Sequence, residues 1–160
     1  MHASVMTWVA AKVVQHDLTT LSTLELGSYD VNGTVRNLFN GSYLGLDIRE
    51  GPCVDLVGDA SCLPFDDDSF ELVVSCEMLE HCEHAVEAVC EATRVVSPGG
   101  LVIITARGPG FPPHDYPHDY WRFRLEDVEA ICFTAGLEIV ELISDTDPDA
   151  PGFFLVGRKP

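Results

Sequence analysis

Basic residues are scarce in this sequence. Nine lysines and arginines stand against 26 aspartates and glutamates, which gives a formal net charge of −17. A surface this acidic repels phosphate backbones, so we expect no direct binding of nucleic acid. Small molecules, neutral glycans and cationic partners are compatible with it. Because acidity also keeps proteins in solution, the charge by itself does not identify a partner.

The sequence also lacks long apolar runs and closely paired cysteines. Apolar runs such as Leu101 to Thr105 have the length of a strand, so no segment is expected to span a membrane. No basic region with a long apolar core follows Met1, so no secretory signal is expected. The cysteines lack the spacing of a zinc ribbon or a disulfide scaffold. We expect most of them to be reduced core residues of a cytoplasmic protein: Cys53, Cys62, Cys76, Cys82, Cys90 and Cys132.

Strand-like and helix-like patterns alternate along the 160 residues, of which 46% are hydrophobic. This length and composition predict one globular domain over residues 1–160. Short apolar runs predict strands at residues 21–26, 43–48, 54–57, 71–75, 101–105, 137–142 and 153–157. Apolar residues at helical spacing predict helices at residues 3–14, 34–39, 85–96 and 125–135.

This order of elements predicts an α/β fold. Alternating strands and helices indicate a mainly parallel, Rossmann-like, doubly wound sheet in a three-layer α/β/α arrangement. Residues 145–152 are too few for a crossover helix, so the last two strands should be antiparallel. Ligands of such sheets bind at the carboxyl ends of the strands, where the strand order reverses.

Three of the predicted strands end in residues that suit a nucleoside. Gly27 follows the first strand and permits a sharp turn close to a ligand. Asp47 ends the second strand, where a carboxylate accepts hydrogen bonds from ribose hydroxyls. Asp59 follows the third and is placed to bind an adenine amino group. A helix starting near Thr34 would add free N–H groups. A dinucleotide dehydrogenase is the competing reading, but its full glycine-rich loop is not present.

Several motifs in this order resemble class I S-adenosylmethionine-dependent methyltransferases, most closely the small methyltransferase type 11 branch. The resemblance spans residues 21–157 and implies a seven-stranded sheet with an antiparallel last strand. It is carried by Glu25-x-Gly27, Asp47, Gly58-Asp59-Ala60, Leu63-Pro64-Phe65-Asp66 through Ser69-Phe70-Glu71, Glu80-His81, and Arg94-Val95-Val96-Ser97-Pro98-Gly99-Gly100.

The resemblance implies S-adenosylmethionine as the cofactor and assigns residues to its parts. Glu25 and Gly27 would line the methionine part, together with their neighbours Ser28 and Tyr29. Asp47 would hold the ribose, Ile48, Asp59 and Ala60 would surround the adenine, and Cys76 and Glu77 would lie beside the sulfonium. The sequence departs from the family at Tyr29 and Val31, which replace two glycines of the loop.

Two segments supply candidates for the acceptor side of the site. A sulfonium is already a strong electrophile, so a base is needed only where the acceptor must lose a proton. His81 and His118 are the candidate bases, although His81 would equally serve to orient its loop. In the aromatic segment 111–124, Tyr120 and Trp121 would stack on a sugar or another flat group, and Arg122 would bind an anion. Trp121 and Phe123 are alternatively core anchors.

No metal is expected, because the histidines and cysteines lack typical zinc spacing and methyl transfer in this branch needs none. The candidate ligands considered were His81, Cys82, His84, His114 and His118. We therefore predict transfer of a methyl group to a small-molecule or sugar-containing acceptor. Two alternatives remain open: a non-catalytic cofactor-binding partner subunit, and an RNA or protein methyltransferase whose partner supplies the missing basic charge.

Overall fold

The computed structural model describes residues 2–114 and 118–160. The strands are β1 (Thr23–Leu26), β2 (Tyr43–Asp47), β3 (Leu56–Val57), β4 (Phe70–Cys76), β5 (Val96–Arg107), β6 (Glu138–Asp145) and β7 (Gly152–Arg158). The helices are α1 (Ala3–Gln15), α2 (Ala85–Val95) and α3 (Leu125–Ala135), with short 3₁₀ turns η1 (Arg36–Leu38) and η2 (Leu79–His81). The predicted order of the strands is confirmed, with shifted boundaries for most of them, and three of the four predicted helices form.

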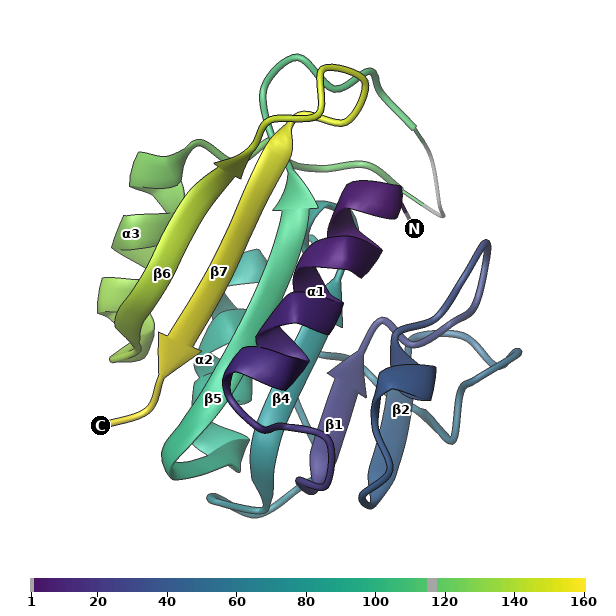
Figure 1. Ribbon diagram of the computed structural model, residues 1–160, viewed down its shortest axis with the longest axis vertical. Helices are drawn as coiled ribbons and strands as arrows, with labels where there is room; N and C mark the ends of the chain where they lie inside the picture. Colours follow the sequence, from purple (N-terminus) through teal and green to yellow (C-terminus); the bar gives the residue numbers. More distant parts are fainter. Residues whose placement is uncertain (1, 115–117) are drawn as a thin grey trace.

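The strands form one seven-stranded sheet in the order β3-β2-β1-β4-β5-β7-β6 (Figure 1). Neighbours from β3 to β5 run parallel, and β7 is antiparallel to both β5 and β6. This confirms the mainly parallel sheet and its antiparallel last strand. The strand order reverses at β1, which lies between β2 and β4. The crevice expected for a ligand therefore lies at the carboxyl ends of β1 and β4.

Helices cover both faces of the sheet, which confirms the three-layer arrangement (Figure 1). Helix α1 packs on one face, where Val5 and Val9 join Val74 and Ile103 in one apolar cluster. Helices α2 and α3 pack on the other face, where a larger cluster surrounds Val73 and Val102. Successive residues of β4 and β5 therefore supply the two cores alternately, as the pleat of a strand requires. No described helix is both long and apolar enough to cross a membrane.

Helix α3 shows why some boundaries follow directly from sequence. Its first turn is closed when the Asp127 carboxylate accepts a hydrogen bond from the Arg124 N–H at 2.9 Å. The helix ends at Gly136, whose φ of +68° is the left-handed conformation that glycine adopts without strain. The predicted range 125–135 is confirmed, because both end signals are local.

The helix predicted for residues 34–39 is wrong, since only the 3₁₀ turn η1 forms there. The Thr34 hydroxyl accepts the Arg36 N–H, and the Arg36 guanidinium binds the Asp55 carboxylate at 2.8 Å. These contacts fix the connection between β1 and β2, which therefore contains a short turn in place of a regular helix. The free N–H groups expected from a helix beginning near Thr34 are therefore not provided. The connection between β2 and β3 also lacks a helix, as predicted.

All six cysteines are free thiols, in agreement with the predicted absence of disulfides. Their expected place in the core holds for Cys76 and Cys132, which are buried. It is wrong for Cys62, which is exposed, and the remaining three are only partly buried: Cys53, Cys82 and Cys90. Cys53, Cys62 and Cys82 lie in or beside loops, where the sequence pattern gives no periodic signal of burial, whereas Cys90 lies within α2.

Candidate functional site

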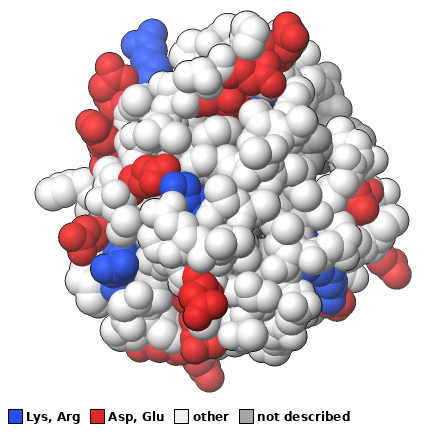
Figure 2. Space-filling view, in the orientation of Figure 1, with Lys and Arg blue, Asp and Glu red and all other residues white. Residues whose placement is uncertain are grey.

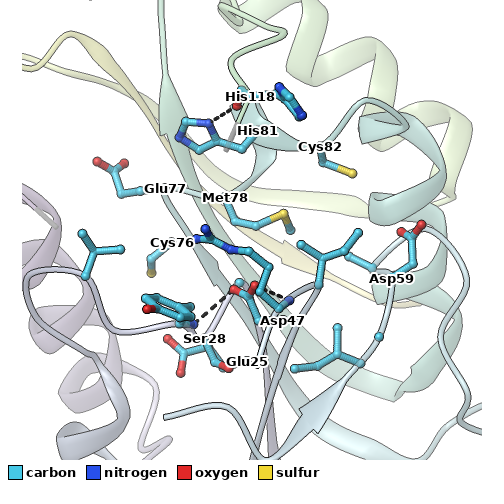
Figure 3. A pocket seen from close by; sticks show the side chains of 18 of the residues that line it. Glu25, Ser28, Asp47, Asp59, Cys76, Glu77, Met78, His81, Cys82 and His118 are labelled. Carbon is cyan, nitrogen blue, oxygen red and sulfur yellow. Dashed lines mark hydrogen bonds between the residues drawn. The ribbon is translucent and has the colours of Figure 1, made fainter. Parts of the chain in front are cut away.

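A cavity of about 570 Å³ opens at the carboxyl ends of β1, β2 and β4 (Figure 3). It lies at the reversal of strand order, where the sequence predicted a ligand. All ten residues predicted to contact a cofactor line this cavity: Glu25, Gly27, Ser28, Tyr29, Asp47, Ile48, Asp59, Ala60, Cys76 and Glu77. The fold thus brings the carboxylates of Glu25, Asp47 and Asp59, which lie apart in the chain, to one cavity.

Gly27 is required at the floor of the cavity for two independent reasons. Its φ of +80° is strained for any residue with a side chain. A Cβ at this position would also lie 2.4 Å from Cβ and Cγ of Met78. Met78 lines the cavity as well, although no motif or spacing in the sequence indicates it. The turn after β1 can therefore approach a ligand only with glycine at this position.

Glu25 and Ser28 place buried polar atoms with no hydrogen-bond partner at the cavity. Glu25 is 3% exposed, and its Oε2 has no partner among the described residues. Burial raises the pKa of this carboxyl group to about 7. The Ser28 hydroxyl is likewise buried and without a partner. Since unsatisfied buried polar atoms are costly, both atoms are suited to bind a polar ligand group.

Asp47 is held in place at the end of β2. Its Oδ2 accepts the Tyr29 N–H at 3.2 Å, and its Oδ1 accepts the Arg49 N–H at 3.1 Å. The Tyr29 ring lies under the Arg49 guanidinium, 4.8 Å from it, and packs against Gly51. Tyr29, which replaces a family glycine, thus lines the cavity without closing it.

Asp59, Ala60 and Ile48 form the outer end of the cavity. One Asp59 oxygen accepts hydrogen bonds from the Ser61 N–H and hydroxyl at 2.8 and 2.7 Å. These bonds lower the pKa of Asp59 below its ordinary value. Ala60 is buried, whereas Ile48 is 60% exposed at the rim. The rim therefore combines an apolar surface with a carboxylate that is ionised at neutral pH.

Cys76 is the last residue of β4, and Glu77 directly follows it. The Glu77 carboxylate accepts hydrogen bonds from the buried Arg107 guanidinium, including one from Nε at 3.1 Å. It also accepts one from the Thr105 hydroxyl at 3.3 Å. Glu77 has a positive φ of 58°, so this ion pair holds a strained backbone position. Burial raises the pKa of the Cys76 thiol well above its ordinary value, which keeps it neutral.

The predicted acceptor-side residues divide into two groups. His81, His118 and Tyr120 line the cavity, whereas Trp121 and Arg122 do not. Residues 115–117 of the aromatic segment lie outside the described residues. His81 Nδ1 lies 2.5 Å from the His118 carbonyl oxygen, which links the two candidate bases.

Arg122 and Trp121 make internal contacts in the structure. The Arg122 guanidinium binds the Asp119 carboxylate and the carbonyl oxygens of Phe111 and Pro112. The Trp121 ring is 46% exposed and donates its Nε1–H to the Cys82 carbonyl at 2.9 Å. The core anchor of this segment is Phe123, which is 6% exposed. Of the two alternatives for a core anchor, only Phe123 is therefore buried.

Residues 32–104 match the family model described as a methyltransferase domain. This stretch, a little under half of the chain, is similar to a methyltransferase domain. The match covers the predicted second to fifth strands, and the fold around it is that of the Rossmann-like methyltransferases. The resemblance to class I S-adenosylmethionine-dependent methyltransferases, stated above on motifs alone, is thereby confirmed.

Curated relatives of this chain carry several methyltransferase names. A phthiotriol/phenolphthiotriol dimycocerosates methyltransferase of Mycobacterium ulcerans is 37% identical over 87 residues, 46% of this chain and 32% of the relative. A malonyl-[acyl-carrier protein] O-methyltransferase of Methylococcus capsulatus is 36% identical over 78 residues, 41% of this chain and 28% of the relative. The chain thus spans about a third of the length of these relatives.

A solved structure extends the likeness of the fold over nearly the whole chain. The 1,6-didemethyltoxoflavin-N1-methyltransferase of Burkholderia thailandensis superposes with a TM-score of 0.78 at 14% identity. The superposition covers 98% of this chain and 78% of that one. That crystal structure holds S-adenosylhomocysteine and 1,6-didemethyltoxoflavin. At this level of identity the likeness establishes the fold.

Proposed function

We propose that this protein transfers a methyl group from S-adenosylmethionine to a small-molecule or sugar-containing acceptor by in-line displacement. The observation that carries the proposal is the convergence of Glu25, Asp47 and Asp59 on one cavity beside a glycine turn. Each carboxylate comes from the end of a different strand or the loop that follows it, so only the folded sheet brings them together. This supports the cofactor site implied by the sequence motifs.

The residues at the inner end of the cavity fit the methionine part of the cofactor. The Glu25 oxygen without a hydrogen-bond partner is suited to accept from an ammonium group, and the Ser28 hydroxyl to bind a carboxylate. The Gly27 turn leaves room for close approach of the ligand to the backbone. When bound, the cofactor supplies a methyl group that is already activated on its sulfonium.

Residues toward the rim fit the adenosyl part. The Asp47 carboxylate is fixed by two backbone N–H groups and keeps lone pairs for the ribose hydroxyls. Ile48 and Ala60 offer apolar surface for the adenine, and Asp59 an acceptor for its amino group. Aspartates and glutamates outnumber lysines and arginines among the described residues along the cavity wall, where the basic side chain is that of Arg49. This balance suits a cationic sulfonium better than the phosphates of a dinucleotide.

His81, His118 and Tyr120 form the acceptor wall of the proposed site. Their role is to align the accepting atom with the methyl group, and His81 would take a proton from acceptors that must lose one. We assign Arg122 and Trp121 to holding this wall in position, since their polar groups bind neighbouring residues. Cys76 and Glu77 close the cavity beside the reacting centre.

The relatives support a small organic acceptor. They are named for a lipid, an acyl-carrier-protein conjugate and a small heterocycle. The net charge of −17 argues against a nucleic-acid acceptor bound by this chain alone. The free thiols are compatible with a reducing, cytoplasmic location.

Calorimetric titration with S-adenosylhomocysteine tests the cofactor site. We expect saturable binding by the wild type and an affinity reduced by about tenfold or more in Asp47→Ala, because hydrogen bonds to a carboxylate are lost. Asp149→Ala, which removes an exposed carboxylate outside the cavity, is the matched control and should bind like the wild type. Wild-type binding weaker than millimolar, or equal binding by Asp47→Ala, would contradict the proposal.

Turnover separates catalysis from binding alone. Methyl transfer from labelled cofactor is measured against a panel of alcohols, acids, amines and sugar conjugates. The position of the labelled methyl group in the product identifies the accepting atom. Tight cofactor binding with no turnover on the panel would favour the non-catalytic alternative.

A further inference from the structure

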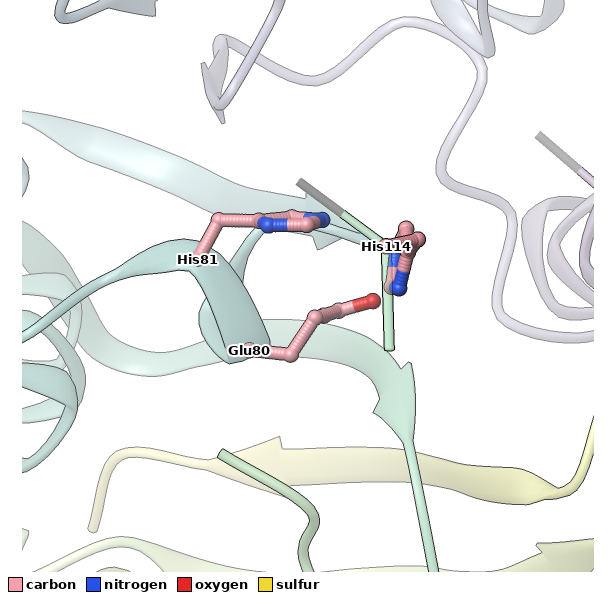
Figure 4. Close-up of side chains that lie close together, drawn as sticks. All are labelled: Glu80, His81 and His114. Atoms are coloured by element: carbon pink, nitrogen blue, oxygen red, sulfur yellow. The ribbon is translucent and has the colours of Figure 1, made fainter. Parts of the chain in front are cut away.

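Three potential metal ligands meet at the acceptor wall of the cavity (Figure 4). Glu80, His81 and His114 each place one ligating atom within 4.8 Å of the others. Glu80 and His81 belong to the turn η2, and His114 belongs to the loop after β5. The distance between them in the chain explains why no metal-binding spacing is visible in the sequence. Glu80 was not among the metal ligands considered there.

The Glu80 carboxylate gives the strongest reason to infer a ligand. The residue is fully buried, and neither carboxylate oxygen has a hydrogen-bond partner in another described residue. The side chain points toward His114 (Figure 4). A buried carboxyl group without partners is costly and rare, so its position calls for an explanation. A bound cation would satisfy both oxygens.

A simple hydrogen bond to an imidazole does not explain the arrangement. Such a bond would place a ring nitrogen within 3.5 Å of a Glu80 oxygen, and neither oxygen has such a partner. The rings of His81 and His114 instead meet edge to face, with centroids 4.6 Å apart. Glu80 therefore makes no hydrogen bond to either imidazole, although the ligating atoms of the three side chains lie within 4.8 Å of one another.

Contacts behind the histidines orient them as metal ligands require. His81 Nδ1 lies 2.5 Å from the His118 carbonyl oxygen and therefore carries the proton, which leaves Nε2 as the lone-pair nitrogen. His114 Nδ1 lies 3.4 Å from both the Asp119 carboxylate and the Arg122 guanidinium, and the His114 backbone N–H donates to Asp119 at 2.7 Å. These contacts position the His114 ring, and the carbonyl partner of His81 is of the kind that fixes the tautomer of metal-binding histidines.

We propose that Glu80, His81 and His114 bind one divalent transition-metal ion, such as Zn²⁺. Two imidazoles and one carboxylate suit this class of ion. Ligand atoms around tetrahedral zinc lie about 3.3 Å apart, since Zn–N bonds are about 2.0–2.1 Å. The three atoms, which lie within 4.8 Å of one another, must therefore approach by up to about 1.5 Å when the ion binds.

The remaining coordination positions would face the cavity, because His81 and His114 line it. If the proposed methyl transfer holds, an acceptor oxygen or nitrogen would occupy such a position and be oriented by it. This last step rests on the proposed function, whereas metal binding itself does not. The two are therefore tested separately.

The experiment is calorimetric titration of the metal-free, tag-free protein with Zn²⁺ in the absence of cofactor. The visible absorption of added Co²⁺ gives a second readout that reports nitrogen and oxygen ligation directly. The variants are Glu80→Gln and His114→Ala, and the control is His84→Ala, which removes a cavity-lining imidazole outside the group. Thermal melts and S-adenosylhomocysteine titrations establish which variants are folded.

We expect one Zn²⁺ per chain, with affinity reduced at least about tenfold in folded Glu80→Gln and His114→Ala and unchanged in His84→Ala. The Co²⁺ absorption should weaken in the same two variants. Absence of saturable 1:1 binding, equal affinity in Glu80→Gln, or equal loss in His84→Ala would overturn the proposal. Zinc binding without binding of S-adenosylhomocysteine would leave the metal site standing and remove the proposed function instead.

Discussion

Single substitutions of Gly27 and Glu25 test two features of the proposed cofactor cavity: the close packing at the glycine turn and the ionisation of a buried carboxyl group. Gly27 combines a positive φ with close packing on Met78, whereas Gly99 has nearly the same φ, +79°, with nothing within 4 Å of a Cβ. Glu25 is a carboxyl group whose charge is disfavoured until a cationic partner arrives. The two residues permit two separate tests.

Gly27→Ala should destabilise the protein more than Gly99→Ala and should abolish measurable binding of S-adenosylhomocysteine. Backbone strain alone costs about 1–2 kcal/mol, which both variants share. The collision with Met78 adds to it only at Gly27. Urea unfolding and calorimetry measure the two effects. Equal destabilisation with retained binding would show that the close approach at Gly27 is unimportant.

The affinity for S-adenosylhomocysteine should rise with pH up to about 7 and then level off. Burial raises the pKa of Glu25 to about 7, so below this pH the carboxyl is mostly protonated. A ligand ammonium favours the ionised form, so binding releases a proton and strengthens up to tenfold per pH unit below the free pKa. Calorimetry from pH 5.5 to 8.5 measures this slope. Glu25→Gln should bind weakly and show a flatter slope, and an unchanged slope would refute the assignment.

At the scale of elements, the segment 118–124 is held against the turn η2. The backbone N–H groups of Tyr120 and Trp121 both donate to the Glu80 carbonyl, at 2.9 and 3.2 Å. The Phe123 N–H donates to the Arg107 carbonyl at the end of β5. The segment 118–124 is thus fixed to η2 and to the end of β5, and the positions of its side chains depend on that attachment.

Arg122→Ala and His118→Ala should lower turnover more than they lower cofactor affinity. Arg122 holds Asp119 and two carbonyls of the wall, and His118 lines the cavity. We expect turnover to fall about tenfold or more and the affinity for S-adenosylhomocysteine to change less than threefold, because misplaced acceptor groups cost rate. Arg158→Ala, on the exposed end of β7, is the control. Equal losses of turnover and affinity would mean that the segment supports the whole cavity.

Prediction of individual elements succeeded where the signals were local. The range of α3 follows from its acidic first turn and Gly136, which act within a few residues. Residues 34–39 also have a helical pattern, but only a 3₁₀ turn forms there. In this turn Arg36 forms an ion pair with Asp55, which is 19 residues further along the chain and which a local pattern does not reveal. Tertiary contacts outweigh the propensity of so short a helix.

At the scale of the whole molecule, the charge of −17 acts on stability. Figure 2 shows acidic groups spread around one face, with few basic groups between them. Ion pairs such as Lys12–Glu141 and Arg94–Glu91 neutralise only a few acids. Self-repulsion among the remaining carboxylates opposes the compact state and is screened by salt.

The melting temperature should therefore rise with ionic strength. We expect an increase of a few degrees between about 20 and 300 mM NaCl at pH 7.5, because the Debye length falls below about 10 Å over this range. Scanning calorimetry in NaCl and in KCl, which share this screening, measures it, with equimolar glycerol as the uncharged control. A melting temperature that is independent of salt would indicate that the acidic groups are already balanced.

The sequence by itself determined the order of the strands, three of the helices, the antiparallel last strand and the residues of the proposed cofactor site. These follow from periodicity, from a connection too short for a helix, and from motifs that stand at strand ends, where the sheet geometry is always the same. Only the tertiary structure decided that Met78 packs under Gly27, that Arg122 is bound within the wall, and that Glu80 lies buried beside His114. Such contacts join loops far apart in the chain, and no local pattern encodes their distance.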